Sequence, residues 1–192
     1  MQELKERIVK EGKVLPGNII KVDGFLNHRI DTTLMSHIAE EFGRHFNMGE
    51  VTMILTAEAS GIALSAIVAQ HFGKPMIFAK KAKSDNIEGG LYQSDIFSYT
   101  YKKKVTLLVS KEWISSEDKV LIIDDFMANG EAMRGLCDIV TAAGATLVGI
   151  GCAVEKGFQG GGDRLRAAGV NLKSLAIIES AEPGNIVFRD EE

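Results

Sequence analysis

The segment VLIIDDFMANGEAM, residues 120–133, restricts the fold more than any other part of the chain. Its apolar, β-branched start is typical of a strand that is buried on both faces, as in a parallel sheet. Two adjacent acids, Asp124 and Asp125, follow directly, and a short loop then leads into a helix predicted from about residue 131 to 143. The segment therefore predicts a parallel sheet that carries two carboxylates at the end of one strand.

The same alternation of strand and helix occurs along most of the chain. Elements are predicted at 31–46 (helix, with Asp31 as N-cap), 51–56 (strand), 60–72 (helix), 75–80 (strand) and 145–156 (strand). Such alternation is typical of an α/β fold in which helices cover both faces of a twisted parallel sheet and ligands bind at the carboxyl ends of the strands. A length of 192 residues fits one domain, and we expect a small N-terminal hood, about 1–30, beside a core of about 31–180.

Charge and cysteine content argue against several classes of protein. The formal net charge is -4, so the chain lacks the excess of Lys and Arg that nucleic-acid binding needs. Cys137 and Cys152 lie in apolar surroundings and are interpreted as reduced core thiols, not as a disulfide framework or a zinc site. The charged N-terminal segment MQELKERIVKEG has neither the apolar stretch nor the cleavage site of a secretion signal, so we expect a cytoplasmic protein.

The loop after the two acids is a candidate anion site. At the start of a helix the backbone N–H groups lack partners within the helix, and the helix dipole favours a phosphate there. The residues that would offer these groups are Ala128, Asn129, Gly130, Glu131 and Ala132. A pair of acids alone is more often a solvated strand end or a helix cap, so the prediction depends on acids, loop and helix occurring together.

A second turn, TAEASGI, follows the strand predicted at 51–56. Its small residues Ala59, Ser60 and Gly61 would let backbone amides come close to a diphosphate. Taken alone, the turn fits equally a plain connection from strand to helix that is capped by Ser60.

These segments together carry a family resemblance, which extends from about residue 3 to residue 188. The segments are LNHRID (26–31), TAEASGIA (56–63), IDDFMANG (123–130) and VEKGFQGG (154–161). They resemble the type I phosphoribosyltransferases, and within that family the members that act on xanthine. The resemblance implies a type I phosphoribosyltransferase fold and transfer of the 5-phosphoribosyl group from phosphoribosyl diphosphate to a purine base, in purine salvage.

The resemblance also assigns roles to the two loops. It implies that Asp124 and Asp125 bind the ribose hydroxyls, that residues 128–132 grip the 5-phosphate, and that the turn at 59–61 holds the diphosphate. Lys81 is the expected partner of the diphosphate charge, although Lys80 and Lys83 are alternatives. Mg²⁺ is expected to arrive with phosphoribosyl diphosphate and not in a site made by the protein alone.

Base recognition is expected, by resemblance, at Ile20, Asn27 and Lys156. Asn27 offers both a donor and an acceptor, and Lys156 offers three donors for the carbonyl oxygens of xanthine. Guanine, hypoxanthine or adenine as the base remain alternatives, as does a regulator that senses phosphoribosyl diphosphate without catalysis. Phe126, which follows the acids, would lie near the base or pack the loop.

Residues 82–104 predict a mobile loop that leads into an antiparallel hairpin. Several Asp, Asn and Gly residues precede the alternating segment LYQSDIFSYT, and three lysines follow it. The length of the loop suggests a lid over the diphosphate. The resemblance, together with the apolar alternation, favours a homodimer, although a buried hairpin would explain the alternation equally well.

Overall fold

A six-stranded sheet forms the centre of the molecule in this computed structural model, which describes residues 1–81, 90–98 and 103–190. The strand order is β10-β9-β8-β7-β3-β4, and every neighbouring pair is parallel except β9 and β10. The strands are β3 (Met53–Ala57), β4 (Met76–Ala79), β7 (Lys119–Met127), β8 (Thr146–Lys156), β9 (Leu172–Glu182) and β10 (Asn185–Phe188). The predicted α/β fold with a parallel sheet is therefore confirmed.

The order of the strands reverses between β3 and β7. From β3 the chain crosses to β4 on one side, whereas β7 is followed by β8 and β9 on the other. Pairing between β3 and β7 ends at Leu55 and Ile122, but β7 continues alongside β8 as far as Met127 and Glu155. A ligand crevice is expected at such a reversal, outside the carboxyl ends of the strands.

This pairing corrects one prediction about the two acids. Asp124 and Asp125 lie inside β7 and not at its end, because β8 keeps pairing with the strand beyond them. The acids nevertheless come after the last residue of β7 that pairs with β3. They therefore stand at the opening between β3 and β7, where β7 pairs only with β8 and no longer with β3.

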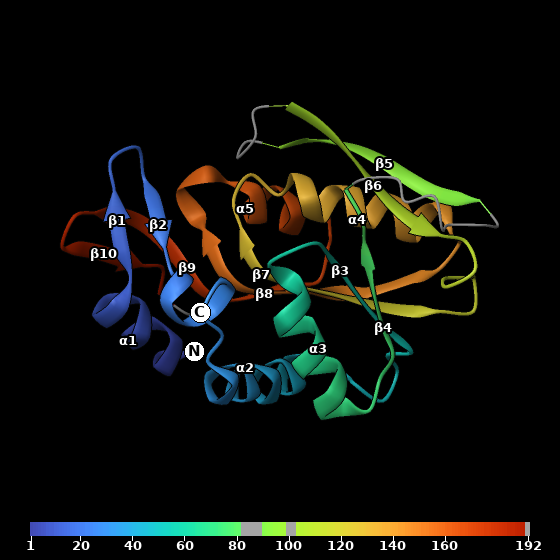
Figure 1. Cartoon of the computed structure of the whole chain (residues 1–192), viewed down its shortest axis with the longest axis horizontal. Coiled ribbons are helices and arrows are strands. Elements are labelled where there is room, and N and C mark those ends of the chain that lie inside the picture. Colours follow the sequence, from blue (N-terminus) through green and yellow to red (C-terminus); the bar gives the residue numbers. More distant parts are fainter. Residues whose placement is uncertain (82–89, 99–102, 191–192) are drawn as a thin grey trace.

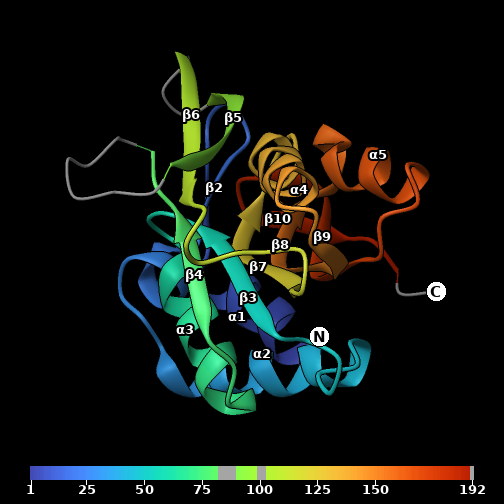
Figure 2. The same cartoon turned by 90° about the vertical axis from the view of Figure 1, so that its right-hand side faces the viewer.

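Helices cover both faces of the sheet (Figures 1 and 2). One face carries α2 (Thr32–His45) and α3 (Gly61–Phe72), and the other carries α4 (Glu131–Ala142) and α5 (Gly161–Ala167), which follows the short 3-10 helix η2 (Gly157–Gln159). The predicted cap of α2 is present, since the side chain of Asp31 accepts a hydrogen bond from the N–H of Leu34 at 3.1 Å. None of the helices in the described part of the chain is long and apolar enough to cross a membrane.

Strand β7 is buried on both faces, as its apolar run predicts. Leu121 and Ile123 belong to the core beneath α2 and α3, and Val120 and Ile122 belong to the core beneath α4. Burial of each such side chain stabilises the fold by about 1.5–3 kcal/mol. A shift of one residue would exchange the two cores, so this packing fixes the register of β7 and with it the position of the acids.

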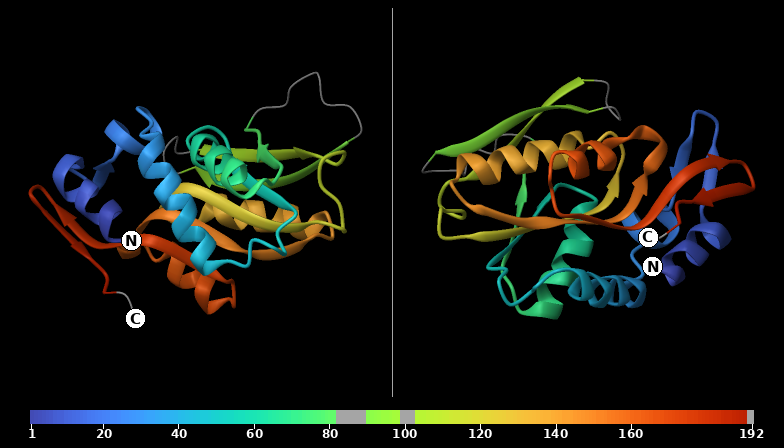
Figure 3. Two further views of the ribbon diagram at one scale, coloured as in Figure 1. Left: turned by 90° about the horizontal axis from the view of Figure 1, so that it is seen from below. Right: turned by 180° about the vertical axis from the view of Figure 1, so that it is seen from behind.

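The N-terminal segment packs against one end of the sheet. It contains α1 (Gln2–Glu11), the strands β1 (Lys13–Leu15) and β2 (Ile19–Lys21) of a small hairpin, and the π-helix η1 (Asp23–Asn27). Both α1 and β1 contact β9, and Figure 3 shows β10 and the end of β9 beside them. This arrangement brings the hairpin and η1 towards the carboxyl ends of β7 and β8.

The predicted antiparallel hairpin is formed by β5 (Leu91–Ser98) and β6 (Lys103–Ser110). It packs on the outer side of α4, and Gly135 of that helix lies directly against Ile96 and Leu107. Residues 82–89 and 99–102 of the expected mobile loop and hairpin, Lys83 among them, lie outside the described residues.

Candidate active site

A hollow of about 200 Å³ opens at the reversal between β3 and β7. It is lined by residues after β3, by the end of β7, by the first turn of α4 and by the β5–β6 hairpin. These residues are Ala57, Glu58, Ser60, Lys81, Ile96, Phe97, Asp124, Phe126, Met127, Ala128, Asn129, Gly130, Glu131, Ala132 and Met133. The structure thus brings the whole predicted loop at 128–132 around one cavity with Ser60 of the second turn, whereas Ala59 and Gly61 do not line it.

Asp125 holds three segments of the chain together. Its side chain is 1% exposed, and its two oxygens accept hydrogen bonds from Ser60 Oγ at 2.8 Å and from Asn27 Nδ2 at 2.9 Å. A buried carboxylate is costly unless donors surround it, and these two supply that need. The predicted ribose, diphosphate and base residues therefore meet at this one carboxylate.

Asp124 lies beside Asp125 and faces the hollow. It is 6% exposed, and its Oδ1 accepts a hydrogen bond from the backbone N–H of Asp125 at 3.0 Å. Burial, and next the charge of Asp125, raise the pKa of Asp124 well above its ordinary value, while the charge of Lys81 acts in the opposite direction. The site therefore contains a carboxyl group whose ionised form would be stabilised by an incoming hydrogen-bond donor or cation.

The first turn of α4 forms the predicted anion loop. Gly130 is the N-cap of the helix and adopts a φ of 77°, a left-handed conformation that glycine reaches without steric cost. Ala128, Asn129 and Ala132 line the hollow with it. The carboxylate of Glu131 accepts a hydrogen bond from Arg134 Nη2 at 3.1 Å, and this bond is the main reason why the pKa of Glu131 is lowered.

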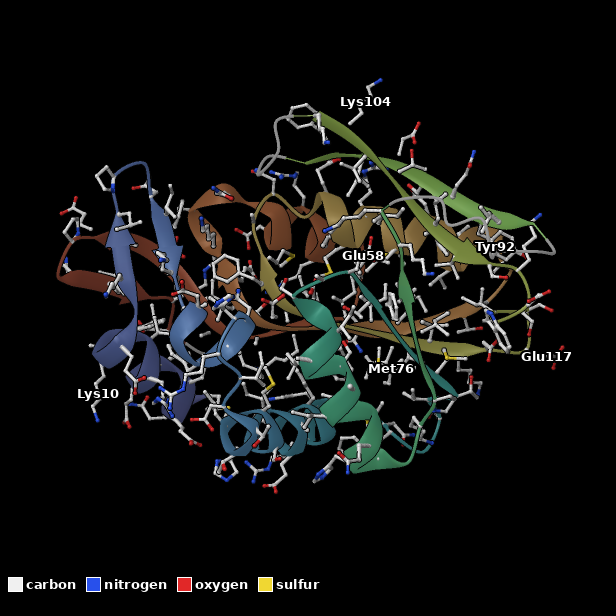
Figure 4. The ribbon with its side chains drawn as sticks, in the orientation of Figure 1. Lys10, Glu58, Met76, Tyr92, Lys104 and Glu117 are labelled. Atoms are coloured by element: carbon white, nitrogen blue, oxygen red, sulfur yellow. The ribbon has the colours of Figure 1, made fainter. Side chains whose placement is uncertain are left out.

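The turn after β3 lies across the hollow from that loop. It contains a cis peptide bond between Glu58 and Ala59, and Ser60 directs its hydroxyl to Asp125 without capping α3. Figure 4 labels Glu58 near the end of β3, beneath the β5–β6 hairpin. Its Oε1 accepts a hydrogen bond from the backbone N–H of Lys81 at 2.6 Å. Two of the three lysines that were candidates for the diphosphate are described by the structure. Lys81 lines this hollow, whereas Lys80 lines another hollow beside Trp113.

The predicted base residues lie at the other end of the site. Lys156 ends β8, and its Nζ donates to the carbonyl oxygen of Asn18 at 3.1 Å and stands 5.5 Å from the ring centre of Phe126. Burial lowers the pKa of Lys156. Ile20 is 8% exposed and packs in the core, and its strand pairs with β1 through Val14. Phe126 joins this end to the hollow, which it lines.

Two supporting groups have no signal in the sequence. Glu155 is fully buried, receives a bidentate ion pair from Arg166 at 3.1 and 2.6 Å, and accepts a further hydrogen bond from Ser174. Arg164 reaches from α5 to the carbonyl oxygen of Asn129 at 3.0 Å. Both groups depend on contacts between α5 and other elements, which the sequence does not show. Charged residues on a short helix, such as Arg164 and Arg166, are ordinarily interpreted as solvated.

Comparison with known sequences places the chain among enzymes of one kind. The family model of the phosphoribosyl transferase domain matches residues 25–168. A protein of Bifidobacterium longum named xanthine phosphoribosyltransferase is 53% identical over 192 residues, which covers 98% of this chain and 100% of that protein. One of the same name from Lachnoclostridium phytofermentans is 52% identical, with 100% of both chains covered.

Solved structures share the fold at much lower identity. Adenine phosphoribosyltransferase of Giardia lamblia, solved with 9-deazaadenine, has a TM-score of 0.75 and 20% identity, covering 90% of this chain and 96% of that one. The Saccharomyces cerevisiae enzyme has the same TM-score at 19% identity, with 91% and 97% covered. A TM-score of 0.75 at this low identity shows that these proteins share the fold, and shows the fold alone.

Proposed function

This chain belongs to the phosphoribosyl transferase family, and we propose that it transfers the 5-phosphoribosyl group from phosphoribosyl diphosphate to xanthine, giving xanthosine 5'-monophosphate and diphosphate in purine salvage. One structural observation carries the proposal: the buried carboxylate of Asp124, which Asp125 adjoins, shares one hollow with the N-terminus of a helix at the reversal of a parallel sheet. Similarity over the full length to proteins named for this reaction supports the choice of base.

In this proposal each loop binds one part of phosphoribosyl diphosphate. The N–H groups at the start of α4 bind the 5-phosphate, because they are unpaired within the helix and the dipole favours an anion. Asp124 and Asp125 accept hydrogen bonds from the ribose hydroxyls. Ser60 and Lys81, which line the hollow, bind the diphosphate together with the neighbouring Ala59 and Gly61.

The chemistry requires positioning and charge stabilisation more than a nucleophilic side chain. Displacement of diphosphate at the anomeric carbon develops positive charge on the ribose, which carboxylates held near it can stabilise. Fixing both substrates in line supplies a further part of the rate enhancement. The hollow, enclosed by β7, α4 and the hairpin, offers a site in which water is partly excluded.

Mg²⁺ fits this site through the substrate. In the described part of the chain no three His, Cys, Asp or Glu side chains come together as a metal site. Asp124, Glu58 and Glu131 offer carboxylate oxygens at the hollow, the substrate offers its own, and Mg²⁺ prefers such ligands together with several waters. When bound, the ion would neutralise the charge of the departing diphosphate.

The base is proposed to lie beside Phe126 and Lys156, beneath the hood formed by the β1–β2 hairpin and η1. Xanthine carries carbonyl oxygens at both its 2- and 6-positions, whereas guanine carries an amino group at position 2, hypoxanthine has hydrogen there and adenine lacks both carbonyls. The ammonium of Lys156 donates to such oxygens. A pocket rich in donors therefore favours xanthine.

We also propose that the protein is a cytoplasmic homodimer. The dimer is suggested by the family resemblance alone, because packing of the β5–β6 hairpin on α4 accounts for the apolar alternation of β5. Sedimentation equilibrium over a range of protein concentrations tests it, and a monomer mass at every concentration would rule it out.

The decisive experiment for the function is a substrate panel. The protein is incubated with phosphoribosyl diphosphate, Mg²⁺ and xanthine, guanine, hypoxanthine or adenine in turn, and the nucleotide is identified by mass spectrometry. Xanthosine 5'-monophosphate should form fastest. A faster product from another base would refute the assignment to xanthine, and binding of phosphoribosyl diphosphate without any product would favour a regulator.

A further inference from the structure

The peptide group between Asn129 and Gly130 is the critical part of the anion loop, because it immediately precedes the first turn of α4. Gly130 has no side chain and adopts a φ of 77°, so the conformation of this peptide is not fixed by its own residues. If this peptide rotated by half a turn, its carbonyl oxygen would take the direction of its N–H and would repel a phosphate at the start of α4. Something outside the loop must therefore hold it.

Helix α5 supplies two such restraints. Arg164 Nη2 donates to the carbonyl oxygen of Asn129 at 3.0 Å, and Arg164 Nη1 to that of Gln159 at 3.4 Å. The carbonyl and the N–H of a trans peptide point in opposite directions, so an Asn129 carbonyl held by the guanidinium turns the Gly130 N–H away from it.

The second restraint is close contact between main chains. A Cβ at Gly161 would lie 2.5 Å from the carbonyl oxygen of Ala128 and 2.6 Å from the nitrogen of Gly130, so only glycine fits there. Helix α5 is itself fixed from below, because Arg166 on the same helix is bonded to the buried Glu155 of β8. The loop therefore packs against a helix whose own position is fixed by a buried ion pair.

We propose that Arg164 is a positioning residue for the phosphate: by holding the Asn129 carbonyl, it keeps the Gly130 N–H directed at the 5-phosphate of the substrate. Arg164 acts through the loop and does not touch the substrate in this proposal. The inference rests on the proposed function, since that function puts a phosphate at the start of α4.

The test measures binding of ribose 5-phosphate by calorimetry to the unaltered protein and to Arg164→Ala, Arg164→Lys and Arg164→Gln. A hydrogen bond to a charged group justifies an expected loss of affinity of about tenfold for Arg164→Ala. Arg164→Lys should lose nearly as much, since an ammonium lacks the planar fork that reaches two carbonyl groups. The Michaelis constant for xanthine at saturating phosphoribosyl diphosphate should stay unchanged.

The matched control is Arg44→Ala on α2, which removes the same charge from an exposed ion pair with Glu41 on the opposite face. It should leave ribose 5-phosphate binding unchanged. Melting temperatures of all variants, measured without ligand, separate positioning from damage to the fold. Added guanidinium ion should restore part of the affinity of Arg164→Ala, and the Gly130 amide resonance should move in that variant even without ligand.

Three outcomes would overturn the inference. One is unchanged affinity in Arg164→Ala, and another is a Lys variant that binds as well as the unaltered protein, because charge alone would then account for the effect. The third is an equal loss in Arg44→Ala. Failure of the unaltered protein to bind ribose 5-phosphate would instead refute the proposed function.

Discussion

Replacing Asp124 by asparagine should make the protein more stable and less active. The side chain is 6% exposed and stands beside the charged Asp125, and both features raise its pKa. An acid whose pKa is higher in the folded than in the unfolded chain destabilises the fold when it is ionised. Asparagine has almost the same shape and can still accept the hydrogen bond from the Asp125 N–H, but it carries no charge.

The expected gain in the free energy of unfolding at pH 7 is about 1–2 kcal/mol, the range found when a destabilising group of this kind is replaced. For a domain of this size, that corresponds to a rise of about 2–8 °C in melting temperature. Loss of a charged acceptor for the ribose should also lower kcat/KM for phosphoribosyl diphosphate roughly tenfold to a hundredfold.

The assay is thermal unfolding followed by circular dichroism between pH 5 and 8. In the unaltered protein Asp124 takes up its proton at a higher pH when folded than the ordinary value of 3.8, so lowering the pH through the folded pKa removes the penalty and adds stability. Asp124→Asn should lack this part of the pH dependence.

The control for this prediction is Glu117→Gln, which removes a carboxylate from an exposed position before β7 (Figure 4). It should change the free energy of unfolding by less than about 0.5 kcal/mol. A melting temperature of Asp124→Asn at or below that of the unaltered protein at pH 7 would refute the reasoning, since it would mean that the ionised carboxylate stabilises the fold.

Three further substitutions test other contacts. Lys156→Met should lower kcat/KM for xanthine about tenfold to a hundredfold with little change in the KM for phosphoribosyl diphosphate, and an effect below about twofold would remove Lys156 from base recognition. Asn27→Ala leaves one oxygen of Asp125 without its donor and should cost about 1–3 kcal/mol in urea unfolding, so an unchanged midpoint would contradict that bond. Arg166→Met leaves the buried Glu155 without its ion-pair partner and should lower the free energy of unfolding by about 3–5 kcal/mol in the same measurement, whereas a loss under about 1 kcal/mol would show that Glu155 finds another partner.

The elements that could be predicted from the sequence are those that depend on neighbouring residues. The cap at Asp31 needs only a side chain and an N–H three positions away, and the buried strand β7 needs only its own apolar run. The predicted end of β7 is wrong, because the strand ends where its pairing with β8 ends, and no local sequence pattern describes that pairing.

The candidate site shows the same division. The residues of each loop could be predicted from local spacing and resemblance, but the partners of Asp125 could not. Asn27 and Ser60 lie 98 and 65 positions away from it, and they meet it only because η1 and α3 pack at the same opening of the sheet. Likewise Arg164 belongs to a charged helix whose sequence does not indicate that it faces the anion loop.

The packing of α1 against β9 has a consequence for synthesis of the protein. Leu4 and Ile8 of α1 are fully buried, yet the strand that α1 contacts begins at Leu172. A ribosome that adds roughly 5 to 20 residues per second needs on the order of 10 to 30 s to make the chain between them. During that time α1 has no native partner strand, so its apolar face is open to chaperones, and the hood can close over the site only after β9 has been made.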